Sequence, residues 1–553
     1  MSAVLEAREP IAKYLSALQP PLVQQFDLLA TAPGGVTKLR ELILALAVQG
    51  KLVPQDPNDE PAGELLKKIR EEKDRLTAEG KIKRDKPLPE ITADEKVFEL
   101  PEGWERAKIG SLTNISTGKL DANAASPDGQ YPFFTCSNTP LAIDRYSFDC
   151  SAVLLAGNGD FNLKHYKGKF DAYQRTYVIE PILLDLKFLY FSISHCIGEL
   201  TKNKRGSAIP YLKMGDITNP PIPVPPLAEQ ARIVARVEEL MRLCDALEAK
   251  GQLEATQHAQ LMQTLLDALT ASTSPQELAD NWQRIATHFD ILLDRPEAIA
   301  AMEQVILQLA VRGLLVPQDP KDEPASELLK KIRAEKDRLI AEGKIKRDKP
   351  LPSIAQDKRP FELPAGWEWV PLQHIGYTQT GTTPDKKNPD LYGSHIPFIK
   401  PGDIHPGDVD YGNEGLSELG LKDSGRTAPS GSILMVCIGT IGKTNIIDRD
   451  CSFNQQINSV TPIFCIPEFI SLYLRCPYFQ SEAWARSSST TISILNKGKW
   501  EEIPLALPPL AEQCRIVAHV ESLLRICSDL RERLAAIQTT QAHLAEALID
   551  EVT

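Results

Sequence analysis

The most regular pattern of apolar positions in the chain lies near its C-terminus. There, apolar residues recur alternately every four and three positions, at Ile516, Val520, Leu523, Cys527, Leu530, Leu534 and Ile537. This heptad spacing is typical of a long helix that packs along another helix. An earlier segment shows the same spacing at Ile233, Val237, Leu240, Cys244 and Leu247, weakens at Gly251 and regains apolar residues around Leu261 and Leu265. We expect two long helices that form an antiparallel pair, the alternative being that each packs only on its neighbouring domain.

A second type of helix is predicted between Glu64 and Glu79. One of its faces is apolar, formed by Leu65, Leu66, Ile69 and Leu76, and charged residues fill the others. A basic segment follows at 81–86 and leads into a linker that contains prolines. The same helix and basic segment recur at 327–342 and 344–349. This charged surface is either simply solvated or a docking surface that binds one partner twice.

These helices belong to a long internal duplication. Residues 52–91 return at 315–354 with 35 of 40 positions unchanged, and FELPEGWE at 98–105 returns as FELPAGWE at 361–368. After Thr117-Gly118 and Thr380-Gly381 the two copies diverge for roughly a hundred residues. Similarity resumes at PPLAEQ, which begins at 225 and again at 508, so the second divergent block is 20 residues longer. Such a repeat predicts one scaffold that carries two different variable domains.

The duplication suggests a division of the chain into six segments. These are an N-terminal helical frame at 1–103, a variable domain at 104–225, a long helix and connector at 226–287, the second copy of the frame at 288–366, a second variable domain at 367–507 and a C-terminal long helix at 508–553. Both variable blocks contain short apolar runs separated by glycines, as in 153–160 and 433–443, and therefore read as mixed α/β domains. The expected fold class is α/β, with two mixed α/β domains on a duplicated helical frame related by a pseudo-two-fold arrangement.

Basic, aromatic, amide and hydroxyl side chains gather at a few places in the variable blocks, and these are the candidate DNA contacts. Such side chains bind phosphates or read base edges, although for each one an ordinary solvated surface role remains open. In the first block they are Lys164, His165, Lys167, Lys169, Arg175, Lys202, Lys204, Arg205, Tyr211 and Lys213. In the second block they are Thr382, Thr383, Lys386, Lys387, Lys443, Asn454, Gln455, Gln456, Arg486, Ser488, Thr490, Lys497 and Lys499.

Composition and charge narrow the function only slightly. The formal net charge of −12 argues against non-specific nucleic-acid binding. The block 104–225 holds 13 Lys and Arg against 11 Asp and Glu, and the block 367–507 holds 11 against 15, so a DNA contact would rely on local clusters. The chain shows neither an apolar run of membrane-spanning length nor a signal pattern, and its ten cysteines lack metal-ligand spacing. We therefore expect a cytoplasmic protein with reduced thiols and no metal site.

Motifs for catalysis are only approximated. Asn219-Pro220-Pro221-Ile222 is similar to the catalytic tetrapeptide of amino-methyltransferases, but its last residue is not aromatic and no glycine-rich cofactor loop accompanies it. Gly442-Lys443-Thr444 is similar to the end of a P-loop, but Cys437 stands at the position of the first glycine. The nine histidines show no metal or triad spacing. The chain is therefore predicted to be non-catalytic and to need no cofactor.

The order of these segments resembles the specificity subunit of bacterial type I restriction–modification systems. The resemblance runs from about Phe26 to the C-terminus and rests on the two frame segments that end in LVPQDP, the FELPEGWE and FELPAGWE entries, the segments at 131–137 and 380–404, and the two PPLAEQ exits. In that family each variable block is a target recognition domain for one half of a split site in double-stranded DNA. The resemblance also implies two bound methyltransferase subunits, motor-nuclease subunits in the full complex, and helices that set the distance between half-sites. A two-armed scaffold that binds proteins, and a stand-alone methyltransferase, are the alternatives.

Overall fold

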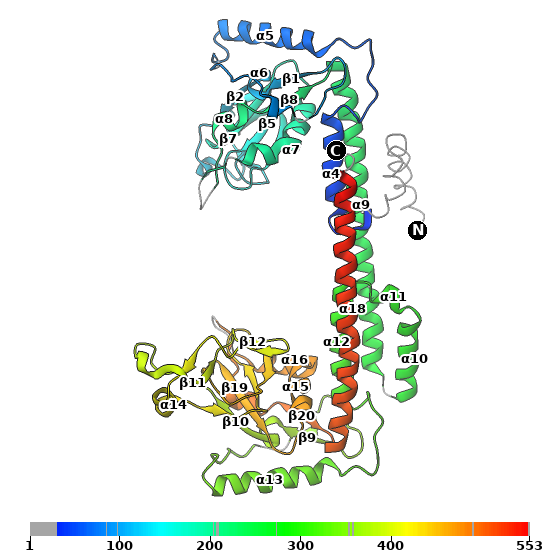
Figure 1. The fold of residues 1–553 in the computed structure, drawn as a ribbon, viewed down its shortest axis with the longest axis vertical. Coiled ribbons are helices and arrows are strands. Elements are labelled where there is room, and N and C mark those ends of the chain that lie inside the picture. Colours follow the sequence, from blue (N-terminus) through cyan, green and yellow to red (C-terminus); the bar gives the residue numbers. More distant parts are fainter. Residues whose placement is uncertain are drawn as a thin grey trace. The chain divides into compact units, whose positions relative to one another are not determined.

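The computed structural model describes residues 30–550, apart from short gaps at 85, 97, 203, 206–209, 273, 352–353, 357–358 and 489–491. The chain divides into two compact units, residues 1–254 with 537–553 and residues 255–536. Each unit contains one α/β domain, a shorter frame helix and parts of two long helices (Figure 1). Among the described residues, no helix is long and apolar enough to cross a membrane.

The two long helices are α9, Leu227–Ala271, and α18, Leu510–Asp550. Each begins directly after a pair of prolines, which suits the first turn of a helix because its N–H groups have no partner within the helix. Gly251 does not interrupt α9, although the sequence pattern weakens there. A glycine inside a helix costs only about 1 kcal/mol, which a helix packed at both ends tolerates.

In the first unit, the start of α9 shares one apolar core with α4, Gly35–Val48, and with the end of α18. The five predicted positions from Ile233 to Leu247 are all buried in this core, together with Ala545 and Ile549 of α18. In the second unit, the end of α9 shares a core with α12, Pro296–Val311, and with the start of α18. Opposite ends of α9 and α18 thus meet in each unit, which confirms the predicted antiparallel pair.

The heptad prediction was wrong at two positions. Leu261 is 52% exposed, whereas its neighbour Met262 is buried with Leu266 and Leu269. Ile537 on α18 is 55% exposed. A straight helix has about 3.6 residues per turn, so a strict seven-residue repeat drifts by about 20° per heptad and the buried stripe moves to the next residue.

The repeated charged helices are α5, Ala62–Ala78, and α13, Ala325–Ala341, as predicted. In α5, Leu65 and Ile69 are buried against the first α/β domain, and Leu66 packs beside them. The second unit also contains α10, Pro275–Thr287, and α11, Phe289–Leu292, between α9 and α12. In α13, Leu328 and Ile332 are buried in the core of the second unit, so α5 and α13 both pack with one apolar face and leave a charged face in solvent.

The first α/β domain lies between two short strands that pair with each other, β1, Glu105–Lys108, and β8, Pro221–Val224. Its six-stranded sheet has the order β2-β7-β5-β6-β3-β4. The strands are β2 (Thr113–Thr117), β3 (Tyr131–Phe134), β4 (Leu141–Ile143), β5 (Phe148–Ala156), β6 (Leu163–Ala172) and β7 (Thr176–Pro181). The helices are α6 (Ile109–Leu112), α7 (Leu186–Lys202) and α8 (Met214–Thr218), and α7 packs on the sheet (Figure 1).

The second α/β domain is enclosed in the same way by β9, Glu368–Pro371, and β20, Pro504–Leu507. One sheet has the order β10-β19-β16-β17, a second has the order β14-β11-β18-β15, and β12 pairs with β13. The strands are β10 (Gly376–Thr380), β11 (Tyr392–Ile399), β12 (Ile404–His405), β13 (Asp408–Val409), β14 (Gly415–Leu416), β15 (Thr427–Ala428), β16 (Ile433–Val436), β17 (Thr444–Ile446), β18 (Cys451–Phe453) and β19 (Ile457–Pro462). The helices are α14 (Glu418–Ser424), α15 (Pro467–Arg475), α16 (Pro477–Arg486) and α17 (Lys497–Glu501).

The two domains have the same core topology, although their sequences are unlike. In both, the first sheet strand pairs with the last one, which pairs in turn with the central strand: β2-β7-β5 in the first domain and β10-β19-β16 in the second. The single strand β6 pairs with β5 and, in parallel, with β3, whereas in the second domain β17 and β18 share these two pairings. Most of the extra length of the second block lies between β11 and β16.

Two glycines at the start of the domains have no room for a side chain. A Cβ on Gly118 would lie 1.8 Å from the carbonyl oxygen of Ala172, and a Cβ on Gly381 would lie 2.2 Å from that of Asn454. Each glycine N–H also donates to the last strand of the sheet, to Thr176 O of β7 at 3.2 Å and to Ile457 O of β19 at 3.0 Å. This close backbone approach explains why a glycine stands at this position in both copies.

We expect Gly118→Ala and Gly381→Ala each to destabilise their own domain by about 2–4 kcal/mol, because backbone must move to admit the methyl group. Gly251→Ala on α9 is the matched control, since its Cβ meets open space. That change should stabilise the chain by up to about 1 kcal/mol. Urea denaturation of the three variants measures the difference, and equal stabilities would show that the close approach is not required.

Candidate nucleic-acid interface and docking surface

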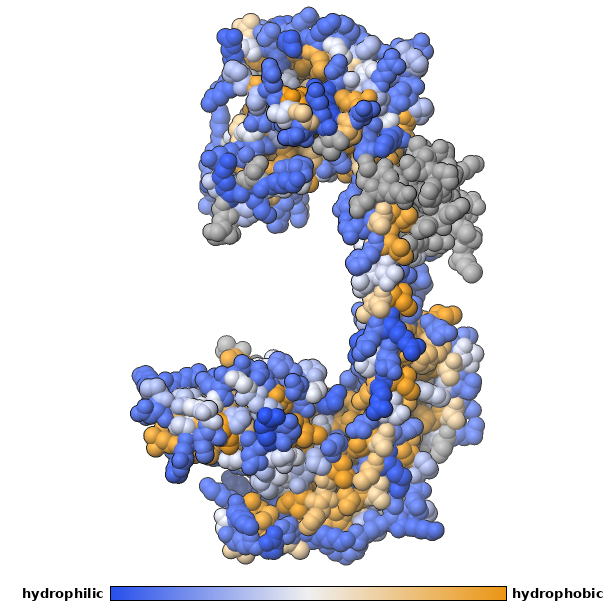
Figure 2. Space-filling model, viewed as in Figure 1, coloured by the Kyte–Doolittle hydropathy of each residue, from blue (hydrophilic) through white to orange (hydrophobic). Residues whose placement is uncertain are grey.

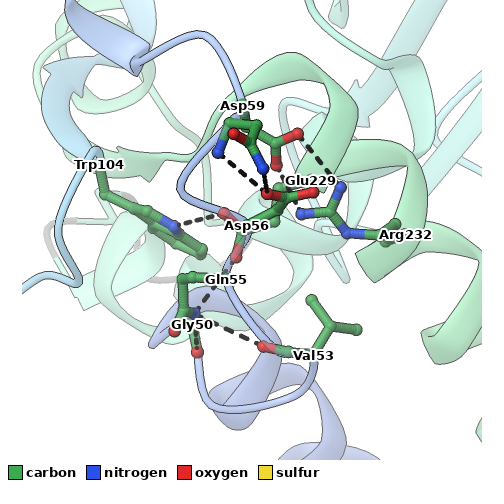
Figure 3. Close-up of polar contacts among 9 residues, drawn as sticks. Gly50, Val53, Gln55, Asp56, Asp59, Trp104, Glu229 and Arg232 are labelled. Carbon is green, nitrogen blue, oxygen red and sulfur yellow. Dashed lines mark hydrogen bonds and ion pairs between the residues drawn. The ribbon is translucent and has the colours of Figure 1, made fainter.

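A buried carboxylate joins the frame to the first α/β domain (Figure 3). Glu229, in the first turn of α9, is 1% exposed and accepts hydrogen bonds from Trp104 Nε1 at 2.9 Å and from Gln55 Nε2 at 3.3 Å. Gln55 also donates to the carbonyl oxygen of Gly50 at 2.6 Å. Burial raises the pKa of Glu229, while the two hydrogen bonds oppose that rise. We call Gln55, Trp104 and Glu229 the first junction.

The second copy of the frame repeats this arrangement. Glu512, in the first turn of α18, accepts from Trp367 Nε1 at 3.0 Å and from Gln318 Nε2 at 3.2 Å. Beside the junctions lie two equivalent ion pairs, Arg232–Asp59 at 2.5 Å and Arg515–Asp322 at 2.6 Å. Each junction thus fixes three segments to one another: the frame loop, the entry to the α/β domain and the start of the long helix.

The sequence prediction did not single out the junction residues. The sequence nevertheless contains a signal, since the same motifs occur in both copies. Trp104 and Trp367 lie in the FELPxGWE entries, and Glu229 and Glu512 lie in the PPLAEQ segments. Gln55 and Gln318 belong to the best-preserved segment. Nothing in the spacing showed that these three motifs meet.

The exposed faces of α5 and α13 carry the same ionic pattern. On α5, Lys67 pairs with Glu64 and Lys68 pairs with Glu60, both at 2.6 Å. The equivalent pairs beside α13 are Lys330–Glu327 and Lys331–Glu323, both at 2.7 Å. Figure 2 shows that the surface over α5 is largely hydrophilic. Two units of one chain therefore present nearly the same charged surface.

One exposed cation in each helix forms no ion pair with the described residues. These are Arg70 on α5 and Arg333 on α13. Arg333 lines a groove beside α13 together with Asp337, Arg347 and His374. Burial and the nearby Lys336 and Arg333 lower the pKa of His374, which keeps this side chain neutral near pH 7.

In the first α/β domain, four of the candidate DNA contacts lie on β6, and alternation along the strand divides them between two faces. His165, Lys167 and Lys169 are exposed on one face, where the His165 ring contacts Tyr190 of α7. Burial and the nearby Lys187 lower the pKa of His165. Lys169 lies over the ring of Tyr146, with Nζ 4.6 Å from the ring centroid.

Lys164 lies on the opposite face of β6 and is half-buried. Its ammonium donates to the carbonyl oxygen of Ser137 at 2.7 Å and to the side chain of Asn162. Burial lowers the pKa of Lys164. The structure therefore gives Lys164 a role in holding the loop after β3, whereas Lys167 projects into solvent.

The remaining candidates of the first domain lie in the turn between β6 and β7 and between the last residue of α7 and the start of α8. Arg205 and Tyr211 form a two-bond backbone ladder, with N–H···O distances of 3.1 and 2.8 Å, and Tyr211 also forms a bridge with Asn158. Arg175 is exposed in the turn between β6 and β7. Lys202, Lys204 and Lys213 are exposed nearby in sequence, and Lys202 pairs with Glu199 at 2.5 Å. The segment of Tyr211 thus meets the turn after β5 at Asn158, next to Gly157, whose N–H donates to Arg175 O at 2.7 Å.

In the second domain, several candidates surround the end of β16. Gln456 and Asn454 lie in the turn before β19, where Gln456 N–H donates to Asn454 Oδ1 at 3.0 Å, and Gln455 is exposed between them. The carbonyl oxygen of Gln456 accepts from Cys437 N–H at 2.8 Å. Lys443 donates to the carbonyl oxygen of Pro401 at 3.0 Å. Thr382 is joined to the same region by a bond from its N–H to Phe453 O at 3.1 Å.

The other candidates of this domain have more local roles. Arg486 pairs with Glu482 at 2.8 Å, Lys497 pairs with Glu501 at 2.5 Å, and Lys499 donates to the carbonyl oxygen of Arg486 at 2.9 Å. Ser488 is exposed, and Thr383, Lys386 and Lys387 lie in the loop before β11. Thr490 falls outside the described residues.

The two near matches to catalytic motifs have structural positions. Asn219 ends α8, and the prolines that follow lead into β8, which pairs with β1. Gly442-Lys443-Thr444 forms the turn from β16 to β17, where the Lys443 ammonium is bound by a carbonyl oxygen. No group of side chains suited to a metal ion occurs in the described part of the chain.

Comparison with known proteins shows which family the chain is similar to. The family model described as type I restriction modification DNA specificity domain matches the chain twice, at residues 101–257 and 364–538. The Escherichia coli type I restriction enzyme EcoEI specificity subunit is 35% identical, and that of EcoAI is 37% identical, each alignment covering 93% of both chains. A crystal structure of the HsdS subunit from Thermoanaerobacter tengcongensis aligns with 82% of this chain and 98% of its own, at 18% identity and a TM-score of 0.38. The chain belongs to the family of type I restriction–modification DNA specificity proteins.

Proposed function

We propose that this chain is the non-catalytic subunit that recognises DNA in a type I restriction–modification complex. The observation that carries the proposal is the presence of two α/β domains with one backbone topology and unlike side chains, each fixed to a copy of the same frame. Both copies of the family model fall on these domains. A common backbone with different exposed side chains is what two readers of different sequences require.

Each recognition domain, 104–225 and 367–507, is proposed to read one half of a split DNA site. Exposed cations such as Lys167 and Lys213 contact phosphates and set the position, while side chains at the ends of β5 and β16 contact base edges. The continuous helices α9 and α18 set the unread spacer between the half-sites. The complex works on chromosomal DNA in the cytoplasm.

A selection from random double-stranded DNA tests this function. The chain is reconstituted with its methyltransferase subunits and used to capture fragments, which are then sequenced. We expect enrichment of two short, unlike sequences separated by a constant number of unread base pairs. A folded, assembled complex that enriches no sequence would favour the protein-binding scaffold and contradict the proposal.

Lys167→Ala is expected to weaken DNA binding to every sequence alike. Loss of one phosphate contact should also reduce the slope of log affinity against log salt by about one. Lys164→Ala should weaken binding too, but it should in addition lower the thermal stability, because the carbonyl group of Ser137 loses its donor. Titrations of fluorescent DNA at several salt concentrations measure both slopes. An unchanged affinity and slope in Lys167→Ala would remove this residue from the interface.

We also propose that α5 and α13 each dock one methyltransferase subunit, and that motor-nuclease subunits join the complete assembly. The proposal rests on the near-identical charged surfaces of the two helices and on the unpaired cations Arg70 and Arg333 within the described surface. Arg70→Glu should lower the affinity of one docking site about tenfold or more. Mass photometry should then show complexes with one methyltransferase subunit, and the double variant with Arg333→Glu should show none.

The differences between the two copies supply a matched control. Position 71 is Glu in α5, and the equivalent position 334 is Ala in α13. Glu71→Ala makes the first surface like the second and should leave both subunits bound. Two bound subunits in the double arginine variant would place the docking surface elsewhere on the chain.

A further inference from the structure

The ends of β5 and β16 share a set of backbone hydrogen bonds that their sequences do not reveal. Gly157 N–H donates to Arg175 O at 2.7 Å, and Cys437 N–H donates to Gln456 O at 2.8 Å. Gly159 N–H donates to Pro210 O at 3.0 Å, and in the second domain Gly439 N–H donates to Ser493 O, also at 3.0 Å. Position by position, the two turns have the same neighbours.

The surrounding segments match in the same way. The ladder between Arg205 and Tyr211 in the first domain corresponds to the ladder between Ser488 and Ile494 in the second, whose distances are 2.9 and 2.8 Å. On the other side, the side chain of Asn162 donates to Cys136 O at 2.5 Å, as Lys443 donates to Pro401 O. These bonds give the two domains the same backbone arrangement around the ends of β5 and β16.

Because the backbone is common, residues at equivalent positions can be compared directly. Arg175 and Gln456 occupy the same position, since each carbonyl oxygen accepts the bond from the residue after the central strand. Arg175 is exposed, and its guanidinium forms no ion pair with the described residues. Gln456 is half-buried, and its Oε1 accepts from Asn454 Nδ2 at 3.2 Å, which orients the amide. One position thus carries two side chains with different base preferences.

We propose that this shared position determines specificity, with Arg175 reading guanine in one half-site and Gln456 reading adenine in the other. An arginine fork can donate two hydrogen bonds to O6 and N7 of guanine, and a glutamine amide can pair in two places with N6 and N7 of adenine. The fixed carbonyl bonds hold both Cα atoms in equivalent places, so the two side chains approach the major groove from the same direction. This inference rests on the proposed function, because it requires that both domains bind DNA.

The residues of the two ladders support the same assignment of guanine to the first half-site and adenine to the second. Arg205, whose guanidinium lies 3.5 Å from the Asp216 carboxylate, is a cation at the position that Ser488 occupies in the second domain. Tyr211 of the first domain corresponds to Ile494 of the second. Ile494 is 42% exposed, and an exposed aliphatic side chain suits the methyl group of thymine, the partner of adenine. The first half-site is therefore expected to be richer in G·C pairs than the second at the contacted steps.

Exchange of the two side chains tests the assignment in the complete complex. Arg175→Gln and Gln456→Arg are each co-expressed with the methyltransferase subunit, and the methylated motif is determined by sequencing. Arg175→Gln should change one position of one half-site from guanine towards adenine, with a shift in relative preference of about 10- to 100-fold. Gln456→Arg should change one position of the other half-site in the opposite sense. The spacer and all other positions should stay as in the wild type.

Two further variants keep the test decisive. Arg175→Lys retains the charge but replaces the two-pronged fork by a single ammonium, so it should keep methylation and weaken the guanine preference less than Arg175→Gln does. Arg145→Gln removes the same charge ahead of β5, at the opposite end of that strand, and should leave the motif unchanged. A wild-type bipartite motif that is identical in Arg175→Gln and Gln456→Arg would overturn the assignment. Absence of any motif in the wild type would instead overturn the proposed function.

Discussion

Replacing Glu229 by alanine should lower the free energy of unfolding by about 2–4 kcal/mol, because the buried indole N–H of Trp104 loses its charged acceptor and the exposed Gln55 side chain loses one bond. Trp104 Nε1 and the side chain of Gln55 both donate to this carboxylate. Water cannot easily replace it, since Glu229 is 1% exposed. The same loss should follow from Glu512→Ala in the second unit, where Trp367 and Gln318 are the donors.

Hydrogen–deuterium exchange can localise each effect. Glu229→Ala should accelerate exchange in residues 50–60 and around Trp104, and Glu512→Ala should do so in residues 313–323 and around Trp367. Glu254→Ala removes an exposed carboxylate from the same helix α9 and should change the stability by less than about 0.5 kcal/mol. If the two junction variants are as stable as Glu254→Ala, the junctions do not fix the domains to the frame.

Lengthening both long helices together should lengthen the unread spacer of the DNA site. Inserting two helical turns, about seven residues, after Glu254 in α9 and after Ala536 in α18 adds about 10.5 Å to each helix. At 3.4 Å per base pair this corresponds to about three base pairs. The insertion preserves which faces of the helices meet, because seven residues complete nearly two turns.

Both half-sites should remain unchanged in this variant, since the recognition domains are untouched. Insertion into α9 alone is the control, because it shifts the buried Met262 and Leu266 away from their partners on α18 and α12 and should destabilise the second unit. Sequencing of the methylated motif measures the spacer. A spacer of wild-type length in the double insertion would mean that something other than these helices sets it.

The helices of the frame were predictable because their apolar positions are periodic. The buried stripe from Ile233 to Leu247 and the helix at 62–78 follow from spacing alone. The prediction failed at Leu261 and Ile537, where the true helical repeat no longer matches seven residues. Periodicity thus predicts that a helix forms and which residues are buried in its first turns. It predicts less well which residues are buried many turns further along the helix.

The common fold of the two variable domains was not predictable in the same way. The common fold depends on backbone hydrogen bonds, which almost any side chain allows. Gly118 and Gly381 are the requirement of this backbone that both sequences show. The candidate DNA contacts were chosen by residue type, so Lys164 and Lys167 were grouped together. Because successive side chains of a strand point to opposite faces, these two residues lie on different faces of β6. Assigning the strand from the sequence would have separated them.

The most direct test of the central claim is a genome-wide map of N6-methyladenine after co-expression of this chain with its methyltransferase subunit. We expect methylation at a two-part motif with a constant gap, present only when this chain is included. Genomic DNA without new methylation, in cells where the two proteins are shown to be folded and bound to each other, would contradict the claim that this chain selects the DNA sequence.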